Sequence, residues 1–264
     1  MTLNLARMGF GITGTVGHDI VRELAPRVEA AGFRTLWFNH AGPGNALASM
    51  QVAASVTSTL RLGSGVVAVD RMPGSYVVRE VRERELPLDR CILGIGASAK
   101  PSPLTTVRDA TELLHGELSA TVYVGALGPK MRRLAVTVAD GELLNWLTPD
   151  AARLAMQEKD ADIAAAMKTG EADVSLYIRV AMGEASRPIL EREAARYAGI
   201  PAYAANFARL GITALEASVY GESPEEVRAG LDRYTGVVDE AVVRAITPND
   251  ALDEFIALVD AVAG

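Results

Sequence analysis

The chain has 264 residues, of which 49% are apolar and 22% are charged, and its formal net charge at pH 7 is −7. These values are ordinary for a globular protein with a large core, and the acidic balance argues against a nucleic-acid partner, which would require clustered Lys and Arg. A single cysteine, Cys91, excludes a disulfide framework, and three histidines leave little for a metal centre. The N-terminal segment lacks the pattern of a signal peptide and no apolar run reaches about 18 residues, so we expect a cytoplasmic protein without a membrane span.

Short β-branched or apolar segments alternate along the chain with longer segments rich in Ala, Leu and charged residues. This texture predicts strands at 8–12, 35–39, 61–69, 91–97, 121–127, 142–147, 174–182 and 240–246. Helical patterns occupy 18–31, 46–57, 75–84, 104–115, 129–138, 149–168, 187–209, 223–233 and 248–262. Pro26 lies inside the first helix, so we expect a kink or a later start there.

Eight strands, each followed by a helix, imply a parallel sheet. Most of these strands, such as Leu62–Val69, are apolar on both faces, which is typical of strands covered on both sides. A doubly wound sheet rarely needs eight such units, whereas a closed (β/α)8 barrel does and usually has about 250 residues. The sequence therefore predicts one TIM-barrel domain over residues 1–264, with the doubly wound sheet as the alternative.

The residues that end the predicted strands are candidates for a functional site, because the chemistry of such barrels lies at the carboxyl ends of their strands. They include one histidine, an amide beside it and several glycines, but no nucleophile–base pair and no set of metal ligands. This composition favours a bound cofactor that does the chemistry while the protein positions it. We take as candidate cofactor contacts Gly11, Asn39, His40, Gly65, Val66, Gly96, Ala97, Gly125, Ala126, Leu127, Gly128, Lys130 and Asn145.

His40 and Asn39 are the candidate catalytic residues. His40 is the only histidine at a predicted strand end, and imidazole titrates near neutral pH, which suits a proton donor or acceptor. The alternative is a structural loop histidine. Asn39 can orient groups but cannot take a proton at neutral pH.

The segment Gly125–Lys130 leads from a predicted strand into a predicted helix. Glycines let backbone N–H groups approach an anion, and a helix N-terminus favours negative charge, so this segment is a candidate phosphate site. The alternative is a tight turn without a ligand. Gly94–Ser98 lacks the third glycine and the partner acid of a dinucleotide fingerprint, and a glycine-lined strand end with room for a flat ligand fits it better.

Several segments, in collinear order, resemble the luciferase-like monooxygenase superfamily. Ala31–Trp37 with Asn39-His40 is similar to its second strand, Thr57–Val66 to its third and Leu93–Gly96 to its fourth. The stretches that resemble its deazaflavin (coenzyme F420)-dependent branch, including the methylenetetrahydromethanopterin reductases, are Val122–Lys130, Ala139–Gly141 and Asn145–Pro149. Tyr197–Tyr203 with Asn206–Gly211 resembles a compact actinobacterial group of F420-dependent oxidoreductases.

The resemblance implies a deazaflavin at the strand ends, its phosphate at Gly125–Gly128 and its ring near Asn39 and His40. It also implies a cis peptide between Gly65 and Val66 that stands behind the ring. The implied activity is hydride transfer between F420 and a small organic substrate. The alternatives are an FMN-dependent monooxygenase and a non-catalytic flavin-binding paralogue.

Departures from the family accompany these expectations. Family members often carry an acid where this chain has Asn39 and where it has Ala97–Lys100, and the connection at 115–120 is short, so we expect a more open site. The resemblance also implies a homodimer. The helix predicted from residue 46 supports this expectation, since Leu47, Met50 and Ala53 make it more apolar than a solvated helix needs.

Overall fold

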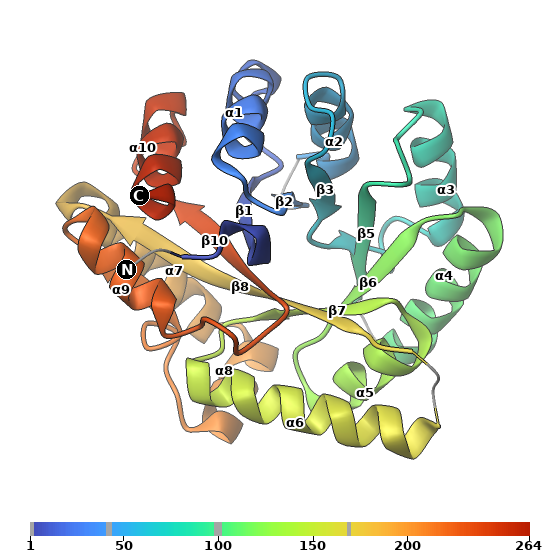
Figure 1. Ribbon diagram of the computed structural model, residues 1–264. Coiled ribbons are helices and arrows are strands. Elements are labelled where there is room, and N and C mark those ends of the chain that lie inside the picture. The colour runs from blue at the N-terminus through green and yellow to red at the C-terminus, as the bar shows by residue number, and fades with distance from the viewer. Residues whose placement is uncertain (1–2, 41–43, 98–101, 168–169) are drawn as a thin grey trace.

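Parallel strands close into a barrel in the computed structural model, which describes residues 3–40, 44–97, 102–167 and 170–264 (Figure 1). The barrel strands are β1 (Met8–Thr13), β2 (Thr35–Asn39), β3 (Arg61–Ser64) continued by β4 (Val67–Ala68), β5 (Cys91–Gly96), β6 (Thr121–Gly125), β7 (Gly141–Asn145), β8 (Asp173–Met182) and β10 (Glu240–Ile246). β10 pairs with both β1 and β8, which closes the ring. The (β/α)8 barrel is therefore confirmed, and the open doubly wound sheet is excluded.

Helices surround the strands on the outside (Figure 1). They are α1 (His18–Ala31), α2 (Ala46–Ala54), α3 (Gly74–Glu83), α4 (Pro103–Glu117), α5 (Pro129–Val138), α6 (Pro149–Ala166), α9 (Pro224–Asp232) and α10 (Leu252–Ala263). Two more, α7 (Arg187–Ala198) and α8 (Pro201–Leu210), stand between β8 and the short strand β9 (Ser218–Gly221). Among the described helices, none is both long and apolar enough to cross a membrane.

Three expectations about elements need correction. The helix expected at 187–209 is two helices, because Pro201 disfavours a helical conformation at Ile200, which is extended with φ −84° and ψ 121°. The strand β9 was missed; it pairs with the last residues of β8. The later start at Pro26 is wrong, since α1 begins at His18 and buries Val21 and Val28 on either side of that proline.

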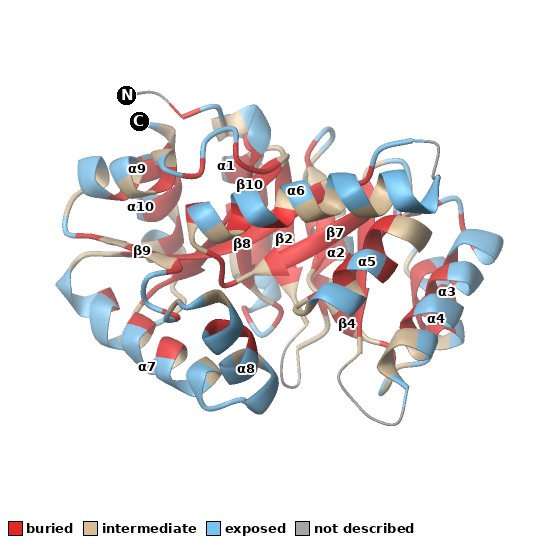
Figure 2. Ribbon diagram, turned by 90° about the horizontal axis from the view of Figure 1, so that it is seen from below, coloured by how far each residue is buried: buried red, intermediate tan, exposed pale blue. Residues whose placement is uncertain are grey.

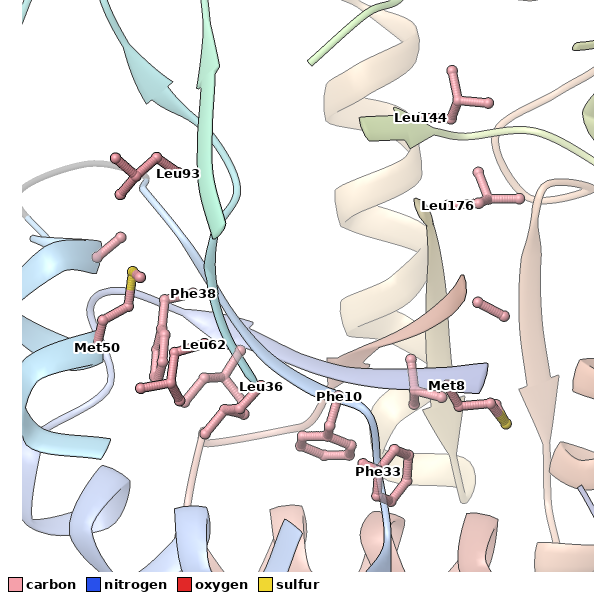
Figure 3. Close-up of a cluster of buried hydrophobic side chains, with 14 of the residues drawn as sticks. Met8, Phe10, Phe33, Leu36, Phe38, Met50, Leu62, Leu93, Leu144 and Leu176 are labelled. Carbon is pink, nitrogen blue, oxygen red and sulfur yellow. The ribbon is translucent and has the colours of Figure 1, made fainter. Parts of the chain in front are cut away.

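The main core lies between the barrel and its helices (Figure 3). Outward-facing strand residues such as Phe38 and Leu62 pack there with α2 residues such as Met50. Figure 2 shows the result, buried strands and helices that are exposed on their outer sides. Leu47, Met50 and Ala53 of α2 are completely buried against their own barrel, so the apolar character of this helix does not support a dimer interface.

A second cluster fills the inside of the barrel. Its members are Trp37, Ile92, Tyr123, Leu143, Tyr177 and Val242. Glycines opposite make room for the large rings: a Cβ on Gly63 would lie 2.2 Å from the Trp37 ring, and one on Gly141 would lie 2.5 Å from the Tyr123 ring. The barrel interior is thus packed with side chains rather than hollow.

Candidate functional site

The inner positions nearest the carboxyl ends of the strands form the upper layer of the barrel. Because side chains on a strand alternate between its two faces, the inward-facing residues of this layer lie two positions, or four on β5, after those of the interior cluster below it. It consists of Gly11, Asn39, Gly65, Gly96, Gly125, Asn145, Arg179 and Arg244. β1, β5, β6 and the end of β3 contribute glycines to this layer, whereas β2, β7, β8 and β10 contribute polar groups. Asn39, Gly65, Gly125 and Asn145 are partly exposed, so solvent reaches this layer.

The Gly65–Val66 peptide is cis, as the resemblance implied. Asn39 Nδ2 donates a hydrogen bond of 3.0 Å to the Gly65 carbonyl oxygen. The Val66 side chain occupies the space over two glycines, since a Cβ on Gly96 or Gly125 would lie 2.9 or 2.8 Å from its methyl groups. We call Gly65–Val66 with its Asn39 support the shelf.

Asn39 also carries a polar atom with no partner. Its Oδ1 is buried and accepts no hydrogen bond from the described residues. The same holds for the Tyr177 hydroxyl, which lies under the shelf, 2.1 Å from the place of a Cβ on Gly65. Buried polar atoms are normally satisfied, so unsatisfied ones beside a partly exposed layer indicate a missing ligand or ordered water.

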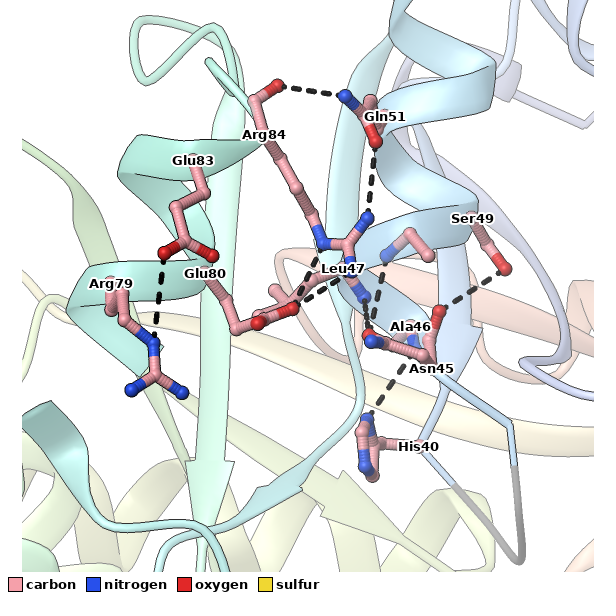
Figure 4. A network of polar contacts seen from close by, with 11 residues as sticks. His40, Asn45, Ala46, Leu47, Ser49, Gln51, Arg79, Glu80, Glu83 and Arg84 are labelled. Carbon is pink, nitrogen blue, oxygen red and sulfur yellow. Dashed lines mark hydrogen bonds and ion pairs between the residues drawn. The ribbon is translucent and has the colours of Figure 1, made fainter. Parts of the chain in front are cut away.

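His40 directly follows β2 and lies at the start of α2 (Figure 4). The Ala46 backbone N–H donates to its Nδ1 over 3.4 Å. Burial, and then the positive charge of Arg71, lower the pKa of His40 below its ordinary value of 6.5. The ring is therefore neutral at pH 7 with its proton on Nε2, which makes no hydrogen bond to the described residues. In this state Nε2 is a hydrogen-bond donor, and the role of His40 as proton donor or acceptor stays a prediction.

The turn from β6 into α5 has the form of an anion site. Gly128 is the N-cap residue of α5 with no capping side chain. The backbone N–H groups of Leu127 and Gly128 have no acceptor within the described part of the chain. A Cβ on Gly128 would meet nothing within 4 Å, and Lys130 is exposed in the first turn. Ala126 is buried, and its N–H is bonded to the Leu143 carbonyl, so Ala126 offers no such donor.

On the far side of the layer, Asn145 is tied into a network. Its Oδ1 accepts from Arg179 at 3.0 Å, and its Nδ2 donates to the Tyr203 hydroxyl at 3.1 Å. Arg179 forms an ion pair of 3.0 Å with Glu193. Each polar atom of the Asn145 amide thus has one partner and can make a second hydrogen bond, and a cofactor contact by Asn145 stays a prediction.

Sequence reasoning missed the α7–α8 partners in this network. Trp146 packs against Arg179, whose guanidinium carbon lies 4.1 Å from the ring centroid, and against the rings of Tyr197 and Phe207. Trp146 is completely buried, which agrees with a packing role, and its φ of +56° is rare for a bulky residue. Joining α7 and α8 into one helix hid these contacts, because the Tyr197–Tyr203 approach requires the break between them.

Two further candidate residues and one cavity complete the description. Gly11 lies on the inner wall of β1 and Ala97 directly after β5, while residues 98–101 lie outside the described part of the chain. A cavity of about 420 Å³ opens between the loop after β1 and the start of α2; it is lined by Gly14, Thr15, Val16, Gly17, His18, Gly44, Asn45 and Ala48. Cys91 faces the outer core and is buried, which raises its pKa to about 12, as expected of an apolar filler.

No model of a known protein family matches the chain. Among characterised proteins, it is 28% identical over 180 residues to the 5,10-methylenetetrahydromethanopterin reductase of Archaeoglobus fulgidus, with 54% of each chain covered. The corresponding enzyme of Methanolobus tindarius is 25% identical over 212 residues, with 64% of each chain covered. The chain thus spans about half to two thirds of the length of the curated relatives it matches.

Solved structures match over almost the whole chain. An F420-dependent secondary alcohol dehydrogenase in complex with an F420–acetone adduct has a TM-score of 0.76 at 15% identity, covering 97% of this chain and 98% of that one. The coenzyme F420-dependent tetrahydromethanopterin reductase of Methanopyrus kandleri has a TM-score of 0.72 at 16% identity, covering 97% of each. The 3,6-diketocamphane monooxygenase of Pseudomonas putida with FMN has a TM-score of 0.68 at 12% identity, covering 97% and 98%. At these identities the likeness establishes the fold, and the neighbours are the F420- and flavin-dependent enzymes that the sequence resembles.

Proposed function

We propose that this protein is an F420-dependent oxidoreductase that transfers a hydride between the deazaflavin and a small organic substrate. The observation that carries the proposal is the polar geometry at the end of β2: Asn39 Nδ2 donates to the Gly65 carbonyl at 3.0 Å, and Asn39 Oδ1 is buried without a hydrogen-bond partner among the described residues. The curated relatives are 5,10-methylenetetrahydromethanopterin reductases, and the structural neighbours include a coenzyme F420-dependent tetrahydromethanopterin reductase; both support this proposal.

The residues of the upper layer fit such a cofactor. The Val66 side chain fills the space over the glycines of β5 and β6 and offers an apolar surface for a flat ring, and Asn39 Oδ1 offers an acceptor for a ring N–H. The turn at Leu127–Gly128 offers free backbone N–H groups at a helix N-terminus, which suits the cofactor phosphate. Lys130 adds a positive charge in the same helical turn.

When bound, the deazaflavin supplies or accepts the hydride. His40 then donates a hydrogen bond from Nε2 to the substrate oxygen and stabilises the negative charge that develops there as a carbonyl is reduced. In the oxidative direction, His40 takes up a proton only after a tautomer change that gives up the Ala46 N–H bond. The resting tautomer therefore favours a role as electrophile over a role as base.

The protein also limits water around the reacting atoms. Val66 presents an apolar side chain over Gly96 and Gly125, and Asn39 fixes the orientation of the peptide that carries it. Since Asn39 and Ala97–Lys100 stand where family members often carry an acid, His40 is the titratable side chain that the proposal relies on. We further propose that the protein is cytoplasmic and forms a homodimer. Sedimentation at micromolar concentrations tests the oligomeric state.

The deciding experiment is a titration of the apoprotein with F420 and, separately, with FMN, followed by fluorescence. Micromolar binding of F420 without binding of FMN supports the proposal. Binding of FMN alone, together with oxygen consumption on reduction, replaces it with the monooxygenase alternative, which the FMN-bound structural neighbour favours. If the protein binds F420 or FMN but turns over no alcohol or carbonyl compound, the non-catalytic paralogue is the remaining alternative.

A further inference from the structure

Two arginines face the barrel interior side by side. Arg179 on β8 and Arg244 on β10 are partners in the strand register, and both are buried, with 2% and 6% of their surfaces exposed. Arg179 contacts the Glu193 carboxylate, the Asn145 amide and the ring of Trp146. The protein therefore gives its guanidinium a carboxylate in direct contact.

Arg244 has no such set of partners. Among the described residues, no carboxylate oxygen lies within 4.0 Å of its guanidinium, and its one hydrogen bond goes to the carbonyl of the adjacent Ala245. Glu193 acts on Arg244 electrostatically but is already paired with Arg179, and Asp250 also attracts it while bonded to Thr247. Burial lowers the pKa of Arg244, which reflects the cost of a desolvated charge. A buried charge is normally paired by direct contact, whereas Arg244 shares the charge of Glu193 with Arg179 and contacts no carboxylate of its own among the described residues.

An unpartnered hydroxyl lies in the neighbouring position. Tyr177 is the register partner of Val242, which precedes Arg244 on the inner face of β10. The Tyr177 hydroxyl is buried without a hydrogen-bond partner. Gly11 lies beside both residues: the place of a Cβ there is 3.5 Å from the Tyr177 ring and 3.6 Å from the Arg244 Cα, and the charge of Arg244 acts on the Tyr177 hydroxyl.

We propose that Arg244 and Tyr177 form an oxyanion subsite that binds a carboxylate of the substrate. The substrate class is then small alcohols or ketones that carry an acidic group. This inference rests on the proposed function, since it deepens the same site. A guanidinium and a phenol O–H supply charge-assisted donors to a carboxylate, and the carboxylate supplies the missing negative charge.

The position argues for substrate rather than cofactor. β10 is separated from β6, which leads into the candidate phosphate turn, by β7 and β8, and from β2, which carries His40, by β1 alone. A substrate whose acidic group lies at Arg244 therefore reaches toward His40 on one side and leaves the β6 turn free. The two anion sites serve different groups.

The experiment uses pyruvate as the probe and propan-2-ol as a neutral comparison, with binding measured by calorimetry on the protein alone and on the F420-loaded protein. Replacing Arg244 by Met should weaken pyruvate binding about tenfold or more, and Tyr177→Phe should weaken it less, because the guanidinium contributes a positive charge as well as hydrogen-bond donors, whereas the phenol contributes one neutral donor. Arg22→Met, which removes an exposed arginine of α1, is the matched control and should change nothing. Propan-2-ol binding should not depend on Arg244.

The outcomes separate this inference from the proposed function. Pyruvate binding to the cofactor-free protein tests the subsite even if the cofactor assignment fails. If the protein binds F420 but does not bind pyruvate, only the subsite is overturned. Wild-type pyruvate affinity in both Arg244→Met and Tyr177→Phe also overturns it. If inorganic phosphate competes with pyruvate and its binding is weakened equally by Arg244→Met, the oxyanion subsite stands and its ligands are phosphoesters. If Arg244→Met does not fold, Arg244→Lys takes its place, and a weakened but charge-dependent affinity is the expected result.

Discussion

The Asn39 amide and the Gly65 carbonyl are joined by a 3.0 Å hydrogen bond, so the end of β2 holds the cis peptide that follows β3. The backbone adds a second link, since the Gly65 N–H donates to the Phe38 carbonyl at 2.9 Å. β2 thus holds Gly65 at both its N–H and its C=O. The Oδ1 atom of Asn39 has no partner among the described residues and is available to a ligand.

Asn39→Ala removes the side-chain link and the free acceptor together. We expect F420 affinity to fall about tenfold, because each lost hydrogen bond contributes about 1 kcal/mol. The fold should persist, since Phe38 still binds the Gly65 N–H. Fluorescence titration measures the affinity and circular dichroism the melting. An unchanged affinity would remove Asn39 from the cofactor site.

Gly128→Asp tests the phosphate turn. The position has open space and a φ of −102°, so the backbone tolerates a side chain there. We expect F420 binding to be lost, because a carboxylate would occupy the helix N-terminus that the phosphate needs. Gly128→Ala is the matched control and should bind F420 almost normally. Equal affinities in the two variants would move the phosphate elsewhere.

Gly63→Ala tests the packing of the interior. Its Cβ would lie 2.2 Å from the Trp37 ring, which is fully buried and cannot retreat. We expect a loss of about 1–3 kcal/mol or more in the free energy of unfolding, measured by urea denaturation. The comparison is Gly116→Ala in α4, whose Cβ meets nothing within 4 Å and which should gain up to about 1 kcal/mol. Similar stabilities in both variants would contradict the tight fit around Trp37.

The barrel could be predicted from the sequence because its strands are buried on both sides. Runs such as Cys91–Gly96 are therefore apolar throughout, and the chain shows each of them as a separate block. The β3–β4 interruption was predicted only through the family resemblance. The four residues of β9 were missed, because a short strand that pairs at one edge carries little apolar pattern.

The polar part of the site could be predicted less well. Asn39 and His40 were found because they end a strand that is apolar before them. The pairing of Arg179 with Glu193 joins β8 to α7, and the Asn145–Tyr203 bond joins β7 to α8. The hydrophobic periodicity of the sequence does not predict such contacts, because they depend on how α7 and α8 are placed over the strands.

His40 gives the prediction with the most specific pH dependence. Its pKa is lowered by burial and by Arg71, so the neutral ring persists below the ordinary value of 6.5. If the neutral ring donates from Nε2, we expect turnover to stay constant as the pH falls to 6.5. It should decline only below that pH, because protonation of Nδ1 removes its hydrogen bond from the Ala46 N–H and with it the proposed orientation of the ring. Arg71→Gln should move this decline toward higher pH, because it removes a charge that disfavours the protonated ring.

His40→Ala should lower turnover about 10²–10³-fold, the usual cost of removing one donor to a developing oxyanion. His40→Gln keeps an N–H donor that does not titrate, so it should retain part of the rate and show no such decline. Steady-state rates of the F420-loaded protein between pH 4.5 and 8, about the range in which imidazole titrates, provide the measurement. An alanine variant with full turnover and a flat profile would return His40 to the role of a loop residue that supports α2.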